Sequence, residues 1–197
     1  MKKNELSKGF FYGMIAICMV LIIFVGIGFG VFAAQPKPIV YQDENGGNIV
    51  INYTNNISGL KIEDAVPTVD SVGMKNNEDN EYFDFSIDIL LDNASSINYE
   101  IAAIKNKDNS TISDDDIRLY LEKENSGEYK EVFKPSPFVP LKEESKFGTK
   151  PGNMVLYSTK ATRSGSERYR LRMWLSDKSL LAKGSYEVEI VVNGNSK

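Results

Sequence analysis

The chain has 197 residues, of which 42% are hydrophobic and 25% are charged, and its formal net charge is −4. This length corresponds to one folded domain. The sequence contains no histidine and one cysteine, which excludes a Ser-His-Asp triad, a Cys-His pair and a histidine-ligated zinc site. We therefore expect a non-catalytic protein that binds no cofactor.

The N-terminal segment has a different composition from the rest of the chain. Residues 9–34 include no charged residue, and this run is long enough to cross a bilayer, which takes ~20 apolar residues. Lys2, Lys3 and Lys8 precede it, and lysines before a first apolar segment keep that end in the cytoplasm. The sequence predicts a cytoplasmic segment at 1–8, a transmembrane signal anchor at 9–34, a spacer at 35–47 and an extracellular domain at 48–197.

The charge of the predicted extracellular part is negative. Three lysines and one glutamate give residues 1–8 a net charge of +2, which leaves −6 for the remainder of a chain of −4. Nucleic-acid binding requires clustered lysine and arginine with a positive field. We therefore expect the membrane to be a partner, through the N-terminal helix, and nucleic acid not to be one.

Two other interpretations of the N-terminal segment remain open. Val31-Phe32-Ala33 ends in a small residue before Ala34, so cleavage after Ala33 would release the domain as a secreted protein. Lys8-Gly9-Phe10 before the apolar run is similar to a prepilin cleavage site, although Met14 stands where prepilins usually carry glutamate. The alternative function is therefore a minor pilin-like or pseudopilin component of a secretion system.

After the spacer, apolar residues alternate with polar ones. The period of two is clearest from Tyr82, where Phe83, Phe85 and Ile87 share one face, as in a half-buried antiparallel strand. Pro135, Pro137 and Pro140 place the stretch from Lys134 to Asn153 in a long loop or at a sheet edge. We expect strands near residues 49–53, 60–62, 82–91, 97–103, 117–122, 129–133, 154–159, 168–175 and 186–192. Seven to nine such strands, with no amphipathic helix among them, predict an all-β antiparallel β-sandwich of the Ig-like or jelly-roll kind.

The order of these segments resembles that of a known family. The strand Tyr82-Phe83-Asp84-Phe85-Ser86-Ile87, the Asn-Ala-Ser-Ser turn into Tyr99-Glu100-Ile101 and the late strand Tyr169-Arg170-Leu171-Arg172-Met173-Trp174 are similar to secreted or surface β-sandwich proteins of Gram-positive bacteria, of the TasA and camelysin type. The resemblance implies a matrix-fibre subunit or a cell-surface protein, and some members of that family are described as proteases. This chain departs from the family in its longer, anchor-like N-terminal segment and in lacking histidine for a zinc site, and no functional residue carries over.

One strand face is a candidate ligand face. Arg168, Arg170, Arg172 and Trp174 alternate with apolar residues, and together they would suit an anionic or sugar ligand, with the indole as a stacking platform. The favoured interpretation is structural: we expect these arginines to pair with Glu187 and Glu189 of an adjacent strand.

Acidic residues suggest two further candidates. Asp108, Asp114, Asp115 and Asp116 have the oxygen ligands that calcium requires, but they lack EF-hand spacing, so we expect a solvated acidic turn and no metal. Pairs of carboxylates are also the machinery of glycosidases, which makes a carbohydrate-active enzyme a further, less favoured alternative.

These observations predict a membrane-anchored cell-surface module. We expect it to act in adhesion, in envelope or matrix assembly, or in protein–protein interaction. The expected partners are surface proteins or glycans, and self-association is a further expectation because unpaired sheet edges can add strands.

Overall fold

A computed structural model describes residues 40–42, 47–53, 58–75, 82–92, 94–180 and 183–196. These belong to one compact unit, Pro38–Lys197. The predicted cytoplasmic segment 1–8 and signal anchor 9–34 lie outside the described residues. Within the described part, no helix has the length and apolar character needed to cross a membrane.

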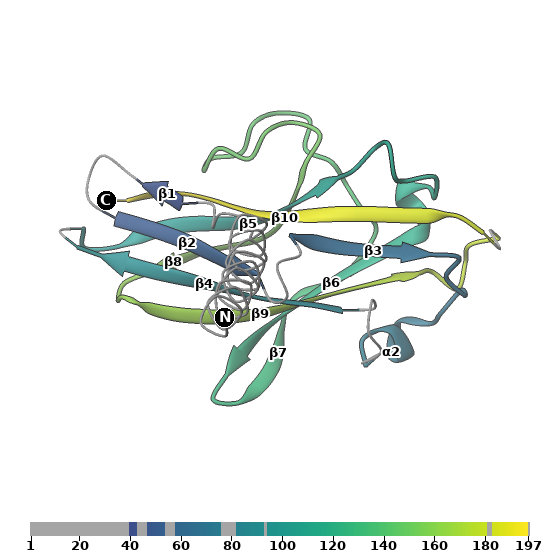
Figure 1. Cartoon of the computed structure of the whole chain (residues 1–197), viewed down its shortest axis with the longest axis horizontal. Coiled ribbons are helices and arrows are strands. Elements are labelled where there is room, and N and C mark those ends of the chain that lie inside the picture. The colour runs from purple at the N-terminus through teal and green to yellow at the C-terminus, as the bar shows by residue number, and fades with distance from the viewer. Residues whose placement is uncertain are drawn as a thin grey trace, which may run out of the picture. The chain divides into compact units, whose positions relative to one another are not determined.

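The described residues form two antiparallel β-sheets with almost no helix (Figure 1). The six-stranded sheet has the order β1 (Val40–Gln42), β2 (Gly47–Tyr53), β4 (Tyr82–Leu91), β9 (Gly165–Leu175), β6 (Ile117–Asn125) and β7 (Glu128–Ser136). The four-stranded sheet has the order β3 (Gly59–Glu63), β10 (Ser185–Ser196), β5 (Ile97–Lys105) and β8 (Met154–Ala161). In the described part of the chain, the helical elements are two single turns, α2 (Asp70–Gly73) and the 3₁₀ turn η2 (Asp114–Asp116). The predicted all-β, sandwich-like architecture is confirmed at this level.

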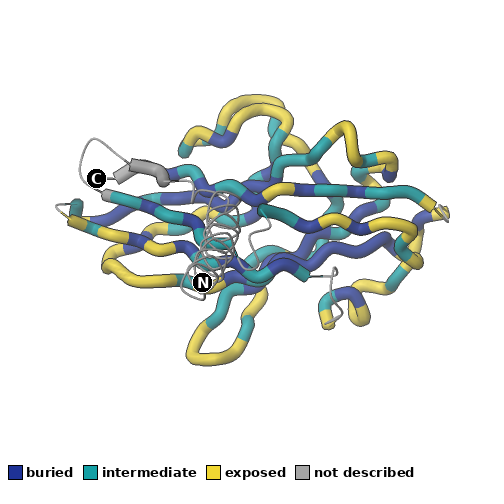
Figure 2. The backbone as a smooth tube through the Cα atoms, in the orientation of Figure 1, coloured by how far each residue is buried: buried dark blue, intermediate teal, exposed yellow. Residues whose placement is uncertain are grey.

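The alternation in the sequence builds the core between the sheets. Phe83, Phe85 and Ile87 of β4 face inward and are at most 5% exposed, while the residues between them are more exposed, a pattern visible along the strands in Figure 2. One continuous cluster of buried apolar side chains draws on both sheets. A hydrogen bond of 2.8 Å from the Tyr53 hydroxyl on β2 to the Ile190 carbonyl on β10 also joins them. Burial of each large side chain stabilises the fold by roughly 1.5–3 kcal/mol.

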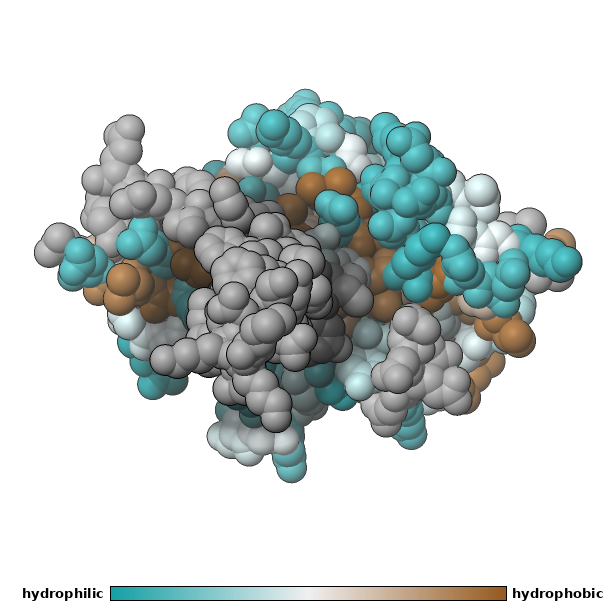
Figure 3. Space-filling model, in the orientation of Figure 1, coloured by the Kyte–Doolittle hydropathy of each residue, from teal (hydrophilic) through white to brown (hydrophobic). Residues whose placement is uncertain are grey.

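A long loop, residues 137–153, is held to the four-stranded sheet by a buried carboxylate. Glu100 on β5 is 2% exposed and accepts hydrogen bonds from the Ser145 hydroxyl and, at 3.1 Å, from the Thr149 backbone N–H. Asn193 on β10 donates to the Thr149 hydroxyl at 2.8 Å. Figure 3 shows hydrophilic side chains gathered along the top of the view, where this loop lies. The prolines therefore mark a loop, as predicted, although β7 first continues to Ser136.

One boundary differs from the prediction. Residues 40–42 pair with β2, with Val40 opposite Val50, so they belong to the sheet and not to the expected spacer 35–47. With β1 included, the described residues form ten strands, compared with the seven to nine expected. A three-residue edge strand is too short to show a period of two, which is why the pattern did not reveal it.

Candidate functional site

The predicted arginine face forms, but its partners are not the predicted ones. β9 lies between β4 and β6, and its outer face, the side away from the core, carries Arg168, Arg170 and Arg172. These arginines contact carboxylates of the two neighbouring strands: Arg170 with Asp84, Arg172 with Glu122 and Arg168 with Glu124. The expected pairing with Glu187 and Glu189 was wrong, because β10 belongs to the other sheet.

The Arg170 side chain contacts one carboxylate and two tyrosine rings. Its Nε and terminal nitrogen donate to the two carboxylate oxygens of Asp84 at 2.6 and 2.7 Å, a bidentate geometry that strengthens an ion pair. The guanidinium also lies 4.4 Å from the ring centres of both Tyr82 and Tyr129, within the range of cation–π attraction. Asp84 raises the pKa of Arg170 above its usual value, against a smaller opposing effect of burial. The guanidinium of Arg170 is therefore engaged by three side chains of the protein itself, which disfavours a role in ligand binding.

Trp174 is not an open stacking platform, which corrects the second half of the ligand-face prediction. It is 5% exposed, and its indole N–H donates to Asp70 at 3.2 Å. α2 covers it so closely that a Cβ added to Gly73 would lie 2.3 Å from the indole Cδ2. Arg172 beside it is also buried and donates to Glu122 at 3.0 Å. The outer face of β9 therefore has a structural role. We term its three arginines, together with Asp84, Glu122 and Glu124, the ladder.

The four aspartates considered for calcium are not gathered into a site. Asp114 in η2 binds Lys105 at 2.6 Å and the Tyr186 hydroxyl at 2.7 Å, while Asp108 lies in the turn after β5. In the described ranges, no three acidic, cysteine or histidine side chains are placed to hold a metal ion. Asp114 is engaged by a lysine and a tyrosine hydroxyl.

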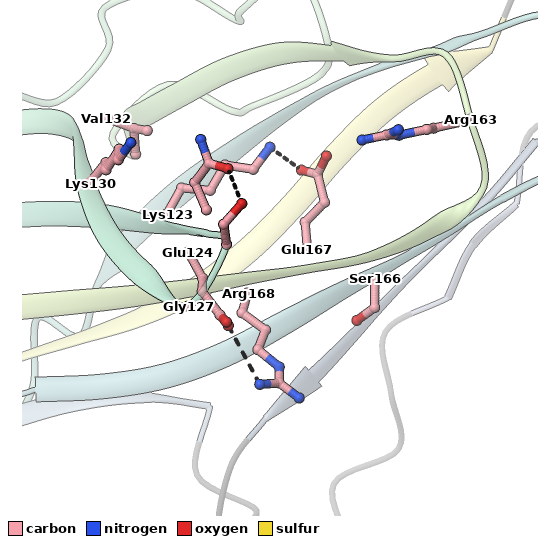
Figure 4. A pocket seen from close by; sticks show the side chains of 11 residues that line it. Lys123, Glu124, Gly127, Lys130, Val132, Arg163, Ser166, Glu167 and Arg168 are labelled. Carbon is pink, nitrogen blue, oxygen red and sulfur yellow. Dashed lines mark hydrogen bonds and ion pairs between the residues drawn. The ribbon is translucent and has the colours of Figure 1, made fainter.

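A groove of about 660 Å³ lies elsewhere, between the β6–β7 hairpin and the turn from β8 into β9 (Figure 4). Figure 4 shows Lys130 and Val132 on one side, Arg163 on the other, and the Lys123–Glu167 ion pair between them. Its polar and charged lining residues are Lys123, Glu124, Asn125, Ser126, Lys130, Arg163, Ser166, Glu167 and Arg168. We term this set, with Gly127 and Val132, the cationic groove.

The cations of the cationic groove differ in whether they are paired. Lys123 binds Glu167 at 2.7 Å, and Arg168 makes a longer contact of 3.5 Å with Glu124. Lys130 and Arg163 are exposed, and neither has a hydrogen-bond or ion-pair partner through its side chain among the described residues. Two cations are therefore free to meet a ligand.

Glu167, which lines the groove, belongs to a partly buried hydrogen-bond network. Glu167 accepts hydrogen bonds from the Tyr99 hydroxyl and, at 2.7 Å, from the Tyr169 hydroxyl, in addition to Lys123. Burial alone would raise the pKa of Glu167, but these hydrogen bonds outweigh it and hold the pKa below its usual value. Burial also raises the pKa of both tyrosines far above the ordinary range. Because a glycosidase general acid needs a raised carboxyl pKa, Glu167 is poorly suited to that chemistry.

Sequence reasoning missed this groove because its cations are dispersed. Lys123 and Lys130 flank a hairpin turn, while Arg163 comes from the β8–β9 turn and Arg168 from β9. No short motif contains all four. The one available signal was the Asn125-Ser126-Gly127 turn, which predicts a hairpin and therefore places the two lysines near each other.

Comparison with known proteins gives little guidance. No protein-family model matches the chain, and no curated protein sequence matches it. Among solved structures, the chain is similar at 11% identity to the collagen-binding domain of Erysipelothrix rhusiopathiae surface protein RspB, with 80% of this chain and 62% of that chain covered and a TM-score of 0.17. The chain thus spans less than two thirds of that structure, and a likeness this low carries no argument about fold or function.

Proposed function

We propose that this protein is a single-pass membrane protein, with its N-terminus in the cytoplasm, that displays its β-sandwich outside the cell as a non-catalytic binding module. The sandwich is of the Ig-like or jelly-roll kind, and the module acts in adhesion, in envelope or matrix assembly, or in protein interaction. The observation that carries the proposal is the cationic groove, in which Lys130 and Arg163 are exposed without a partner among the described residues.

The sequence supports external display. The uncharged run 9–34 follows three lysines, which favours an uncleaved anchor with the following residues outside. The domain after it contains no cysteine and relies for stability on the apolar core shared by its two sheets. The order of segments in the sequence also resembles that of surface proteins of the TasA and camelysin type.

Binding is favoured over catalysis by the state of the carboxylates in the groove. Glu124 and Glu167 both contact cations, at 3.5 and 2.7 Å. A glycosidase requires one carboxyl group that holds a proton and another that is free to attack or to activate water. The lowered pKa of Glu167 does not suit the carboxyl group that must hold a proton, and both carboxylates are engaged by cations of the groove.

Cysteine labelling on intact cells tests the orientation. In a Cys18→Ser background, a single cysteine is introduced by Thr162→Cys in the exposed turn before β9, or by Asn4→Cys as the matched cytoplasmic control. We expect a membrane-impermeant maleimide to label residue 162 on intact cells and residue 4 only after lysis. The reverse pattern would refute external display.

The mass of the mature N-terminus separates the alternatives. An intact N-terminus supports the anchor. A chain that begins at Phe10 would instead indicate prepilin processing and a pilin-like role. A chain that begins at Ala34 would make the domain a secreted protein.

A further inference from the structure

We infer that the cationic groove binds an anionic polysaccharide, with Lys130 and Arg163 as its principal contacts. The inference rests on the proposed function, because it names the ligand class of that binding module. Three features of the groove support it: its charge, the strand register that places Lys123 and Lys130 opposite each other, and the chemical character of its lining.

The charge of the groove is opposite to that of the chain. Four cations and two carboxylates line it, in a chain whose net charge is −4. Both carboxylates already contact a cation of the groove, so the remaining positive charge is that of Lys130 and Arg163. An oxyanion is the ligand that such a site attracts, and the arginine fork can bind it through two parallel hydrogen bonds.

The register of the β6–β7 hairpin concentrates this charge. Lys123 lies directly opposite Lys130, and Glu122 lies opposite Glu131, so the lysines share one face of the hairpin and the glutamates share the other. Like charges directly opposite each other destabilise a strand pair. Strand pairing within the hairpin therefore gives no stabilising role to the charge of Lys130. An anion bound between Lys130 and Arg163 would offset the repulsion between Lys123 and Lys130.

The lining favours a polysaccharide over an acidic peptide. Val132 is the only apolar side chain that lines the groove in the described part of the chain, and no aromatic ring does so. Docked peptides usually insert apolar anchors into pockets, and neutral sugars usually stack on aromatic rings. Here Asn125, Ser126 and Ser166 offer hydrogen bonds instead, which suits the hydroxyl groups of a charged sugar polymer.

The anionic group has two chemical sources. A carboxylate of a uronic acid and a phosphate ester along a polymer both present oxyanions to Lys130 and Arg163. The shared chemistry defines the proposal, and the choice of probes distinguishes the sources.

Binding is measured with the full-length chain in a nonionic detergent. The immobilised probes are polygalacturonate for carboxylates and dextran phosphate for phosphate esters, with neutral dextran and poly-glutamate beside them. The test variant is Lys130→Gln with Arg163→Gln. The matched control is Lys142→Gln with Lys150→Gln, which removes the same charge from two exposed lysines of the 137–153 loop outside the groove.

We expect polygalacturonate, dextran phosphate or both to bind, with neutral dextran and poly-glutamate bound more weakly. The test variant should lose about tenfold in affinity, and the control variant less than twofold. Raising the salt concentration from about 20 to about 150 mM should weaken polyanion binding by the wild-type chain. Binding to neither polyanion, equal losses in test and control variants, or tighter binding to poly-glutamate would overturn the inference. None of these results affects the labelling pattern at residues 162 and 4, so the inference and the proposed display can fail separately.

Discussion

Two regions of the same sheet use the same residue types in opposite ways. On the outer face of β9, arginines meet carboxylates of both neighbouring strands, and Arg170 is enclosed by Asp84, Tyr82 and Tyr129. In the cationic groove, Lys130 and Arg163 stand exposed without partners in the described residues. The comparison teaches that a row of arginines does not by itself mark a binding surface; the feature to look for is charge that the fold leaves unmatched.

The free-energy consequences of the two regions should differ accordingly. A charge removed from the ladder leaves its partner desolvated and unpaired, which is costly. Removal of the charge of Lys130 or Arg163 leaves no unpaired partner among the described residues, and surface substitutions of that kind usually change stability by less than about 0.5 kcal/mol. Four substitutions test this difference.

The largest effect is expected at the most buried pair of the ladder. Arg172→Met leaves Glu122 beside it without its cation, and the Arg172 side chain is only 6% exposed. We expect the free energy of unfolding to fall by about 3 kcal/mol, measured by denaturant titration of the full-length chain. The double variant Arg172→Met with Glu122→Leu should recover most of this loss, and an unchanged midpoint for the single variant would contradict the structural role of the pair.

Glu167→Gln is expected to cost about 2 kcal/mol at pH 7, because two tyrosine hydroxyls and Lys123 lose a charged acceptor. The pKa of Glu167 in the folded chain lies below its usual value of 4.5. The stabilisation is therefore complete above about pH 4.5 and is lost as the pH falls through the lower folded value. The difference between wild type and variant should be constant from pH 7 to pH 5 and shrink below that; a difference that grows on acidification would show that the pKa is raised instead.

Arg170→Lys should have an intermediate effect. Lysine keeps the charge but cannot reproduce the two parallel hydrogen bonds to Asp84 or stack as a plane between two rings. We expect a loss of about 1 kcal/mol in the free energy of unfolding. The control is Arg168→Lys on the same face, whose side chain is 69% exposed and makes one contact of 3.5 Å; equal effects at the two positions would remove the distinction between them.

The smallest effect has the opposite sign. Lys130→Glu replaces a like-charge pair with an attractive one opposite Lys123, and we expect it to raise the free energy of unfolding by about 0.5 kcal/mol while weakening polyanion binding by about tenfold. Glu131→Lys makes the equivalent change opposite Glu122, on the other face of the hairpin, and should leave that binding intact. If Lys130→Glu neither stabilised the chain nor weakened binding, the contrast between the two regions would not hold.

Most strands could be predicted from the sequence, because burial of one sheet face imposes a period of two. The segment from Tyr82 to Leu91 shows it, and the observed strand has those bounds. The order of strands in the sheets could not be predicted in the same way. Alternation shows which face of the sheet a residue occupies but not which strand lies beside it. The predicted pairing of Glu187 and Glu189 of β10 with the arginines of β9 was therefore wrong, because these strands belong to different sheets.

The candidate site was less predictable than the fold. The arginines of β9 attracted attention because they are close in sequence, whereas the groove draws on Lys130 and Arg163, which are far apart and become neighbours only through the pairing of β6 with β7 and with β9. The burial of Trp174 could not be predicted from the sequence either. Trp174 alternates like an outward residue, but α2 closes over it from a segment about a hundred residues earlier.

The cover over Trp174 has a practical consequence. The chain contains a single tryptophan, and its indole rests against Gly73 and donates to Asp70. Tryptophan fluorescence therefore reports from one known position, where α2 lies on β9. A red shift of the emission signals that α2 has separated from β9, which gives a label-free way to distinguish local opening at this end of the ladder from unfolding of the whole domain.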